Sequence, residues 1–80
     1  MTWDYRVVRY RDGSGSGLHE VFYDKDGAPS GMTEQPANFV FAEAEDDKAE
    51  IVSALIAALR DATRKPVLDE PARWPGENPG

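Results

Sequence analysis

Two neighbouring segments near the N-terminus carry apolar or aromatic residues on both faces of a strand, which constrains the fold more than any other feature. The segments are residues 3–10 (WDYRVVRY) and residues 18–23 (LHEVFY). A strand that is half-buried in a lone domain alternates apolar and polar residues. A sheet built from these segments therefore requires a cover on each face. One later helix supplies one cover, and we expect a second copy or a partner to supply the other.

A flexible loop joins the two segments, and a tight turn follows the second. Residues 11–17 (RDGSGSG) are rich in glycine and serine, which favour a loop. Residues 24–27 (DKDG) predict a hairpin turn, because aspartate stabilises turns locally and glycine takes positive φ. A third strand is expected at residues 30–34 (SGMTE). Residues 38–42 (NFVFA) either continue that edge or form a separate short strand.

The clearest element is an amphipathic helix over residues 46–63. Asp47 followed three residues later by Glu50 fits the capping-box pattern, and Pro66 prevents the helix from continuing. At about 100° per residue, the apolar residues cover roughly 200° of the helix surface, whereas one sheet face requires little more than about 100°. The residues that we expect on the sheet are Ile51, Leu55, Ala58, Leu59 and Ala62.

The width of this apolar arc has two consequences. The flank at Val52 and Ile56 is free to contact something other than the sheet. Truncation of Leu55 or Leu59 to alanine, if both pack on the sheet as expected, costs about 2–5 kcal/mol.

After the helix, prolines and glycines predict an extended tail. Val67 and Leu68 alone are able to add a short edge strand there. We therefore predict one α+β domain over residues 1–70, an antiparallel meander of three to four strands with one amphipathic helix packed on one face. A disordered Pro/Gly-rich tail is expected at residues 71–80, in which Trp74 either stays free or docks on the domain.

Size and charge exclude several classes of function. A chain of 80 residues buries only about 60–65% of its unfolded surface, and without cysteine neither disulfides nor thiolate zinc sites reinforce it. Association is the remaining reinforcement. The net charge of −6 opposes phosphate binding, so we expect no nucleic-acid partner. The longest mainly apolar run, residues 54–59, is far shorter than a membrane span, so we expect a cytoplasmic protein with no membrane contact.

No motif predicts catalysis, a metal or a cofactor. His19 and Glu20 are neighbours in a strand and point to opposite faces, so they cannot act as an acid–base pair. Residues 24–27 resemble the start of a calcium loop, but Pro29 and Gln35 stand where an EF-hand requires glycine and glutamate. The Gly-Ser loop lacks the lysine of a phosphate-binding loop. We expect a non-enzymatic protein without a cofactor.

These observations predict a small interaction protein that forms a homodimer. The residues expected at its interaction surface are Trp3, Tyr5, Tyr10, Val21, Tyr23, Val52 and Ile56. Two alternatives remain open. The acidic residues around the helix start allow an antitoxin-like regulator that binds a basic partner protein, and the sheet aromatics allow a small-molecule binding domain.

Three motifs together resemble a group of short bacterial proteins for which no activity is established. They are Trp3-x-Tyr5-Arg6-Val7-Val8, His19-Glu20-Val21-Phe22-Tyr23-Asp24-x-Asp26-Gly27 and Lys65-Pro66-Val67-Leu68-Asp69-Glu70. The resemblance covers about residues 3–70 and implies a bacterial source, with no functional residue to carry over. The chain is more distantly similar to HicB-like antitoxins, small sheet-and-helix proteins that oligomerise and neutralise a toxin. Their strand–strand–helix–strand order differs from the order expected here, in which a third strand precedes the helix.

Overall fold

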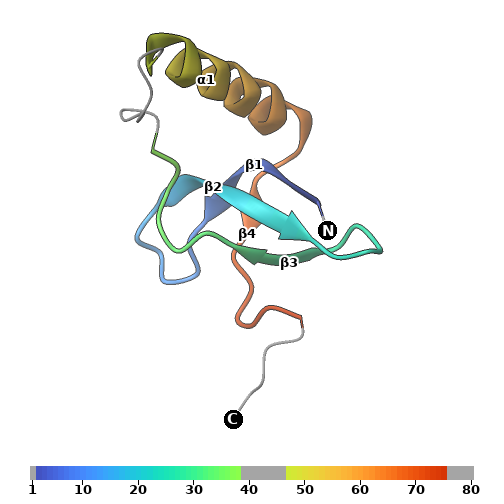
Figure 1. The fold of residues 1–80 in the computed structure, drawn as a ribbon. Helices are drawn as coiled ribbons and strands as arrows, with labels where there is room; N and C mark the ends of the chain where they lie inside the picture. Colours follow the sequence, from blue (N-terminus) through green and yellow to red (C-terminus); the bar gives the residue numbers. More distant parts are fainter. Residues whose placement is uncertain (1, 39–46, 76–80) are drawn as a thin grey trace.

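In the computed structural model, which describes residues 2–38 and 47–75, the chain forms a four-stranded mixed sheet with one helix on one side (Figure 1). The elements follow in the order β1 (Thr2–Arg9), β2 (Ser16–Tyr23), β3 (Pro29–Met32), α1 (Asp47–Arg64) and β4 (Leu68–Asp69). The strand order in the sheet is β3-β2-β1-β4. β4 runs parallel to β1, and the other pairs are antiparallel. The predicted α+β class is confirmed.

The tight turn at residues 24–27 is also confirmed. The Asp24 side chain accepts hydrogen bonds from the backbone N–H groups of Asp26 (2.9 Å) and Ala28 (3.0 Å). Gly27 has a φ of 82°, a conformation that glycine adopts without a steric cost. The turn brings β3 back along β2, with Phe22 opposite Gly31.

Element boundaries differ from the predicted ones by one or two residues. β3 begins at Pro29 and ends at Met32, and the next segment stays against β2 because the N–H of Thr33 donates to the carbonyl of Glu20 (3.0 Å). β4 begins at Leu68, one residue later than expected. The start of the predicted helix at residue 46 and the strand-like residues 39–42 lie outside the described residues.

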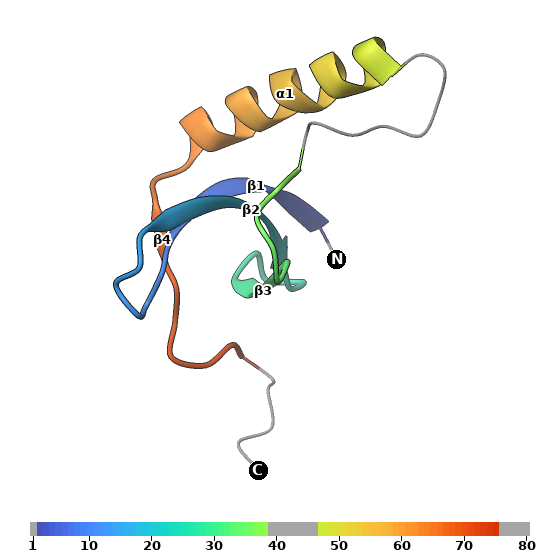
Figure 2. The ribbon, with the colours of Figure 1, turned by 90° about the vertical axis from the view of Figure 1, so that its left-hand side faces the viewer.

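The sheet buries one of its faces without a second copy. Val8 and Val21 are fully buried and Tyr23 is 5% exposed, and the partly buried Met32 and Leu68 pack against them. Figure 2 shows that the sheet curves, so that β3 lies beneath the arch of β1 and β2. The expected need for a partner on this face is therefore wrong, because side chains from the two edge strands, β3 and β4, cover it.

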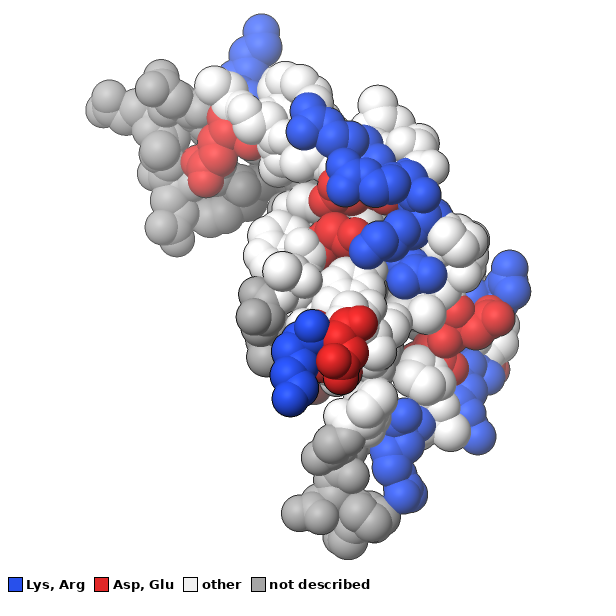
Figure 3. Space-filling model, turned by 90° about the vertical axis from the view of Figure 1, so that its right-hand side faces the viewer, with Lys and Arg blue, Asp and Glu red and all other residues white. Residues whose placement is uncertain are grey.

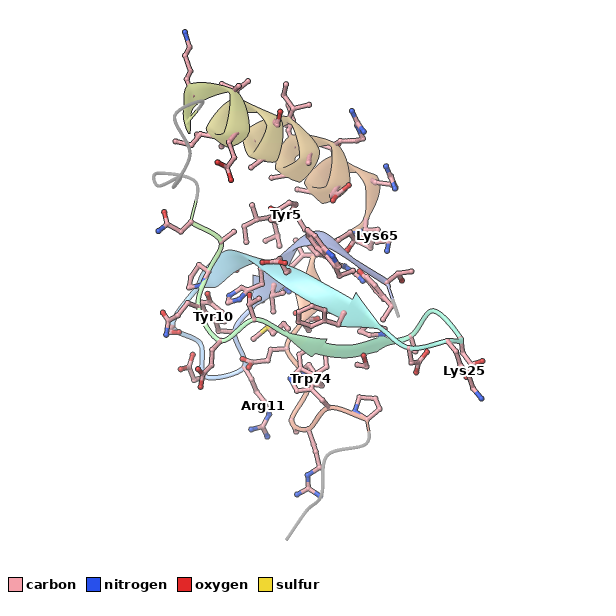
Figure 4. The ribbon with its side chains drawn as sticks, in the orientation of Figure 1. Tyr5, Tyr10, Arg11, Lys25, Lys65 and Trp74 are labelled. Atoms are coloured by element: carbon pink, nitrogen blue, oxygen red, sulfur yellow. The ribbon has the colours of Figure 1, made fainter. Side chains whose placement is uncertain are left out.

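The segment after β4 adds to this side of the molecule. Trp74 is partly buried and lies beside β3 (Figure 4). Together with Pro29, Leu68 and Pro71, it lines a cavity of about 320 Å³. Within the described residues, the tail thus runs between the two edges of the sheet.

The other face of the sheet receives α1. Ala58, in the second half of the helix, is 4% exposed. Tyr5 lies between β1 and α1 (Figure 4), and its backbone N–H donates to the Asp61 carboxylate at 3.2 Å. Burial raises the pKa of the Tyr5 phenol, and the charges of Glu20 and Asp61 raise this pKa further. The Asp61 carboxylate thereby satisfies a backbone N–H on the outer edge of β1, the edge that faces away from β2.

A polar cluster fastens the end of α1 to β1. Lys65 Nζ lies 2.8 Å from the Asp4 carboxylate and 3.9 Å from the centroid of the Tyr23 ring. The Tyr23 hydroxyl donates to the other Asp4 oxygen at 2.8 Å, and Arg6 Nε donates to the Pro66 carbonyl at 3.0 Å. The hydrogen bond to Asp4 is the main reason why the pKa of Lys65 is raised.

This cluster predicts an alkaline loss of stability. Because the folded pKa of Lys65 lies above its ordinary value of 10.5, the stabilisation is present below that pH and is lost as the pH rises through the folded pKa. Lys65→Met should lower the free energy of unfolding at neutral pH by about 0.2–1 kcal/mol, the range for exposed pairs. Urea titrations should show that the difference from the native chain shrinks at strongly alkaline pH.

Lys25→Met is the matched control, because Lys25 is exposed in the hairpin turn. Its effect on stability should stay small at every pH. The pKa of the Tyr5 phenol is also raised, but Tyr5 is present in all three proteins, so its contribution cancels from the differences. A stability difference for Lys65→Met that stays constant from neutral to alkaline pH would contradict the prediction.

Candidate interaction surface

The helix contacts the sheet through small residues rather than through its leucines. Ala58 is buried and Ala54 and Ala62 are partly buried, whereas Leu55 is 47% and Leu59 67% exposed. The prediction that these leucines pack on the sheet is therefore wrong. The Asp61 carboxylate accepts from the Tyr5 backbone N–H at 3.2 Å, which turns the side of α1 that carries Ala58 and Asp61 toward β1.

Four large apolar side chains form a continuous stripe on the exposed side of α1. Val52, Leu55, Ile56 and Leu59 are 43%, 47%, 53% and 67% exposed, and we call them the α1 seam. Their spacing of i, i+3, i+4 and i+7 places them on one face of the helix. At about 100° per residue, Leu59 is turned about 100° away from Ala58. Figures 1 and 2 show α1 as an outer layer, with all the strands of the sheet on one side of it.

Two of the predicted surface residues belong to the seam, and a third is exposed elsewhere. Val52 and Ile56 belong to the seam and are exposed, as expected for the flank of the helix that is free of the sheet. Trp3 is 50% exposed near the start of β1 and contacts Tyr5 edge to face, with ring centroids 5.2 Å apart. Tyr5 itself lies beneath α1.

The remaining predicted surface residues are buried or partly buried within the domain. Val21 and Tyr23 belong to the buried cluster and leave no area for a partner. Tyr10 is partly buried, and its hydroxyl pairs with His19. The structure thus does not bring the seven predicted residues together on one surface. The signal for the seam was the excess width of the apolar arc, which does not show which part of the arc meets the sheet.

His19 is held as a structural residue. It is 1% exposed, with Nδ1 2.9 Å from the carbonyl oxygen of Thr33 and Nε2 2.7 Å from the hydroxyl of Tyr10. Because a carbonyl only accepts, Nδ1 carries the proton, and Nε2 accepts from the tyrosine. Both ring nitrogens are occupied, so no free base is presented to a substrate.

Comparisons give no family to guide the interpretation. No family model, no curated protein and no solved structure matches this chain. Among residues 2–38 and 47–75, no helix is long and apolar enough to cross a membrane, and no three acidic, histidine or cysteine side chains gather as metal ligands. A cavity of about 290 Å³ lies at the Gly-Ser loop, lined by Arg9, Tyr10, Gly13, Gly15 and Ser16. Among the described residues, most of the large apolar side chains that are exposed belong to the α1 seam.

The Tyr10–His19 pair predicts an intolerance to side chains at Gly17. A Cβ atom there would overlap the Tyr10 hydroxyl and lie 3.2 Å from Nε2 of His19. Gly17→Ala should therefore lower the free energy of unfolding by about 1–3 kcal/mol in denaturant titrations, the usual cost of overpacking. The cost should be smaller in a Tyr10→Phe background, because the overlapping oxygen is gone.

Gly31→Ala is the matched control, since its Cβ would meet nothing closer than a Phe22 ring carbon at 3.9 Å. It should be neutral or slightly stabilising, because alanine loses less backbone freedom than glycine on folding. Equal losses at Gly17 and Gly31 would contradict the packing described here.

The arrangement of α1 predicts opposite effects at adjacent positions. Leu59→Ala should cost at most about 1 kcal/mol, because a side chain this exposed gains only a fraction of the transfer free energy on folding. Ala58→Leu should cost about 1–3 kcal/mol, because it overfills the contact with β1. Denaturant titrations at low protein concentration measure both values. A larger loss for Leu59→Ala than for Ala58→Leu would contradict the observed helix orientation.

Proposed function

We propose that this chain is a small non-enzymatic interaction protein that self-associates through the α1 seam. The observation that carries the proposal is a contrast in burial. Val8 and Val21 are completely buried, yet four large apolar residues in a row along α1 are 43–67% exposed. Isolated exposed apolar residues are normal on a monomer, whereas a contiguous stripe of them marks an interaction site.

The surroundings of the seam resemble those of a protein interface. Lys48, Ser53, Arg60 and Thr63 are exposed and border the stripe at its ends and along one flank. An apolar centre with a polar rim is the usual anatomy of an interface, and this helical spacing suits a second helix. Since α1 carries such a stripe, another copy of the chain is a partner of matching chemistry.

Association through a sheet edge has less support. The outer edge of β1 is occupied by Asp61, which accepts from the Tyr5 N–H, and by β4, which pairs with Val8 and Arg9. β3, at the other edge, is four residues long and begins with Pro29, which has no N–H to donate. Short strands and proline protect edges from pairing.

The two alternatives also have less support than self-association. A basic partner protein suits the net charge of −6, but the basic residues Arg60 and Arg64 are exposed near the end of α1. A small-molecule site on the sheet aromatics would need accessible rings, whereas Tyr23 is 5% exposed and Tyr5 lies beneath α1. Both remain proposals of second rank.

Sedimentation equilibrium of the full chain tests the proposed function. The native chain should show twice the monomer mass at micromolar concentrations. Ile56→Glu should weaken the dimer at least tenfold, because each copy loses about half of the 1.5–3 kcal/mol that full burial of isoleucine provides, and each 1.4 kcal/mol is tenfold. A monomeric native chain at high micromolar concentration would refute the proposal.

Val67→Glu is the matched control. Val67 is 45% exposed, which is close to the exposure of the seam residues, but it follows the helix and lies outside the seam. The same apolar-to-acidic change should leave the dimer dissociation constant within about twofold of the native value, within the few tenths of a kcal/mol typical of neutral surface changes. Circular dichroism of both variants should show native helix content.

A further inference from the structure

We infer that the two copies pair with their α1 helices antiparallel, so that a two-fold axis passes between Leu55 and Ile56 of each seam. The inference rests on the proposed self-association and adds the orientation of the partner. It follows from the exposure and spacing of the seam residues and from the direction of the helix dipole.

The seam protrudes more at one end than at the other. The exposed fraction rises from 43% at Val52 to 67% at Leu59. An antiparallel pair places the less exposed, smaller Val52 of one copy against the more exposed, larger Leu59 of the other. A parallel pair places the two Leu59 side chains against each other and the two Val52 side chains across a wider gap. Interfaces favour the arrangement that fills space evenly.

The seam is also symmetric about its centre. Residues 52, 55, 56 and 59 keep the same spacing when the helix direction is reversed, so a reversed copy presents a matching stripe. In that arrangement Leu55 of one copy meets Ile56 of the other, two side chains of the same volume with similar exposure, 47% and 53%. A two-fold dimer of this kind is closed, so it does not extend into a filament.

The backbone dipole of α1 also favours the antiparallel pair. Charged side chains of both signs stand near each end of the helix: Lys48 and Glu50 near its start, and Arg60, Asp61 and Arg64 near its end. Figure 3 shows basic side chains, with acidic ones among them, on the side of the molecule where α1 ends. An antiparallel pair brings the N-terminus of each helix beside the C-terminus of the other, so that opposite ends of the two dipoles lie together. A parallel pair would place like ends together.

Cysteine cross-linking of the full chain tests the orientation, since the native sequence contains no cysteine. Three variants are needed: Val52→Cys, Leu59→Cys and Ile56→Cys, each carrying a tag that distinguishes its mass. Disulfides form only between cysteines whose Cα atoms are within about 7 Å. Under mild oxidation, an equal mixture of Val52→Cys and Leu59→Cys should give mainly the mixed dimer, with at least fivefold less of either homodimer. Ile56→Cys, next to the axis, should cross-link with itself.

The outcomes separate this inference from the proposed function. If sedimentation shows that the native chain is a monomer, the proposed function fails, and the orientation fails with it. If the native chain and the reduced variants are dimers but Val52→Cys and Leu59→Cys each cross-link with themselves, the helices are parallel and only the inference is overturned. Dimers that form no disulfide at any of the three positions would place the interface elsewhere and also overturn it.

Discussion

The close approach of α1 to β1 through alanine determines the rest of the structure. With Ala58 buried at the contact, the Asp61 carboxylate reaches the backbone N–H of Tyr5. Just beyond the helix, Lys65 reaches Asp4 at 2.8 Å. These two polar contacts fix the rotation of the helix about its axis. Because the small side chains face the sheet, the larger apolar ones necessarily face outward.

Much of the fold could be predicted from local sequence signals. The aspartate–glycine turn at residues 24–27 specified the second hairpin, and Pro66 correctly placed the end of the helix within two residues. Leu68 was expected in a short edge strand and is found in β4. These features depend on backbone preferences within a few residues, which a sequence expresses directly.

The orientation of the helix and the covering of the sheet could not be predicted in the same way. Periodicity locates an apolar arc but does not show whether its alanines or its leucines meet the sheet, because that choice depends on polar contacts with β1 that are distant in sequence. Likewise, residues 3–10 and 18–23 indicated a sheet with apolar residues on both faces, but not what covers the face that carries Val8 and Val21. Only the curvature of the sheet shows that Met32 and Leu68 of the edge strands complete this core.

The parallel pairing of β4 with β1 has a consequence for biosynthesis. Val8 pairs with Leu68, so β1 receives this neighbour only after β2, β3 and α1 have been made. Loop closure over such a separation is slow relative to local hairpin formation. A chain emerging from the ribosome can form β1, β2 and β3 early, while the outer edge of β1 stays open to other nascent chains. The two-residue strand β4 thus completes the topology of the sheet.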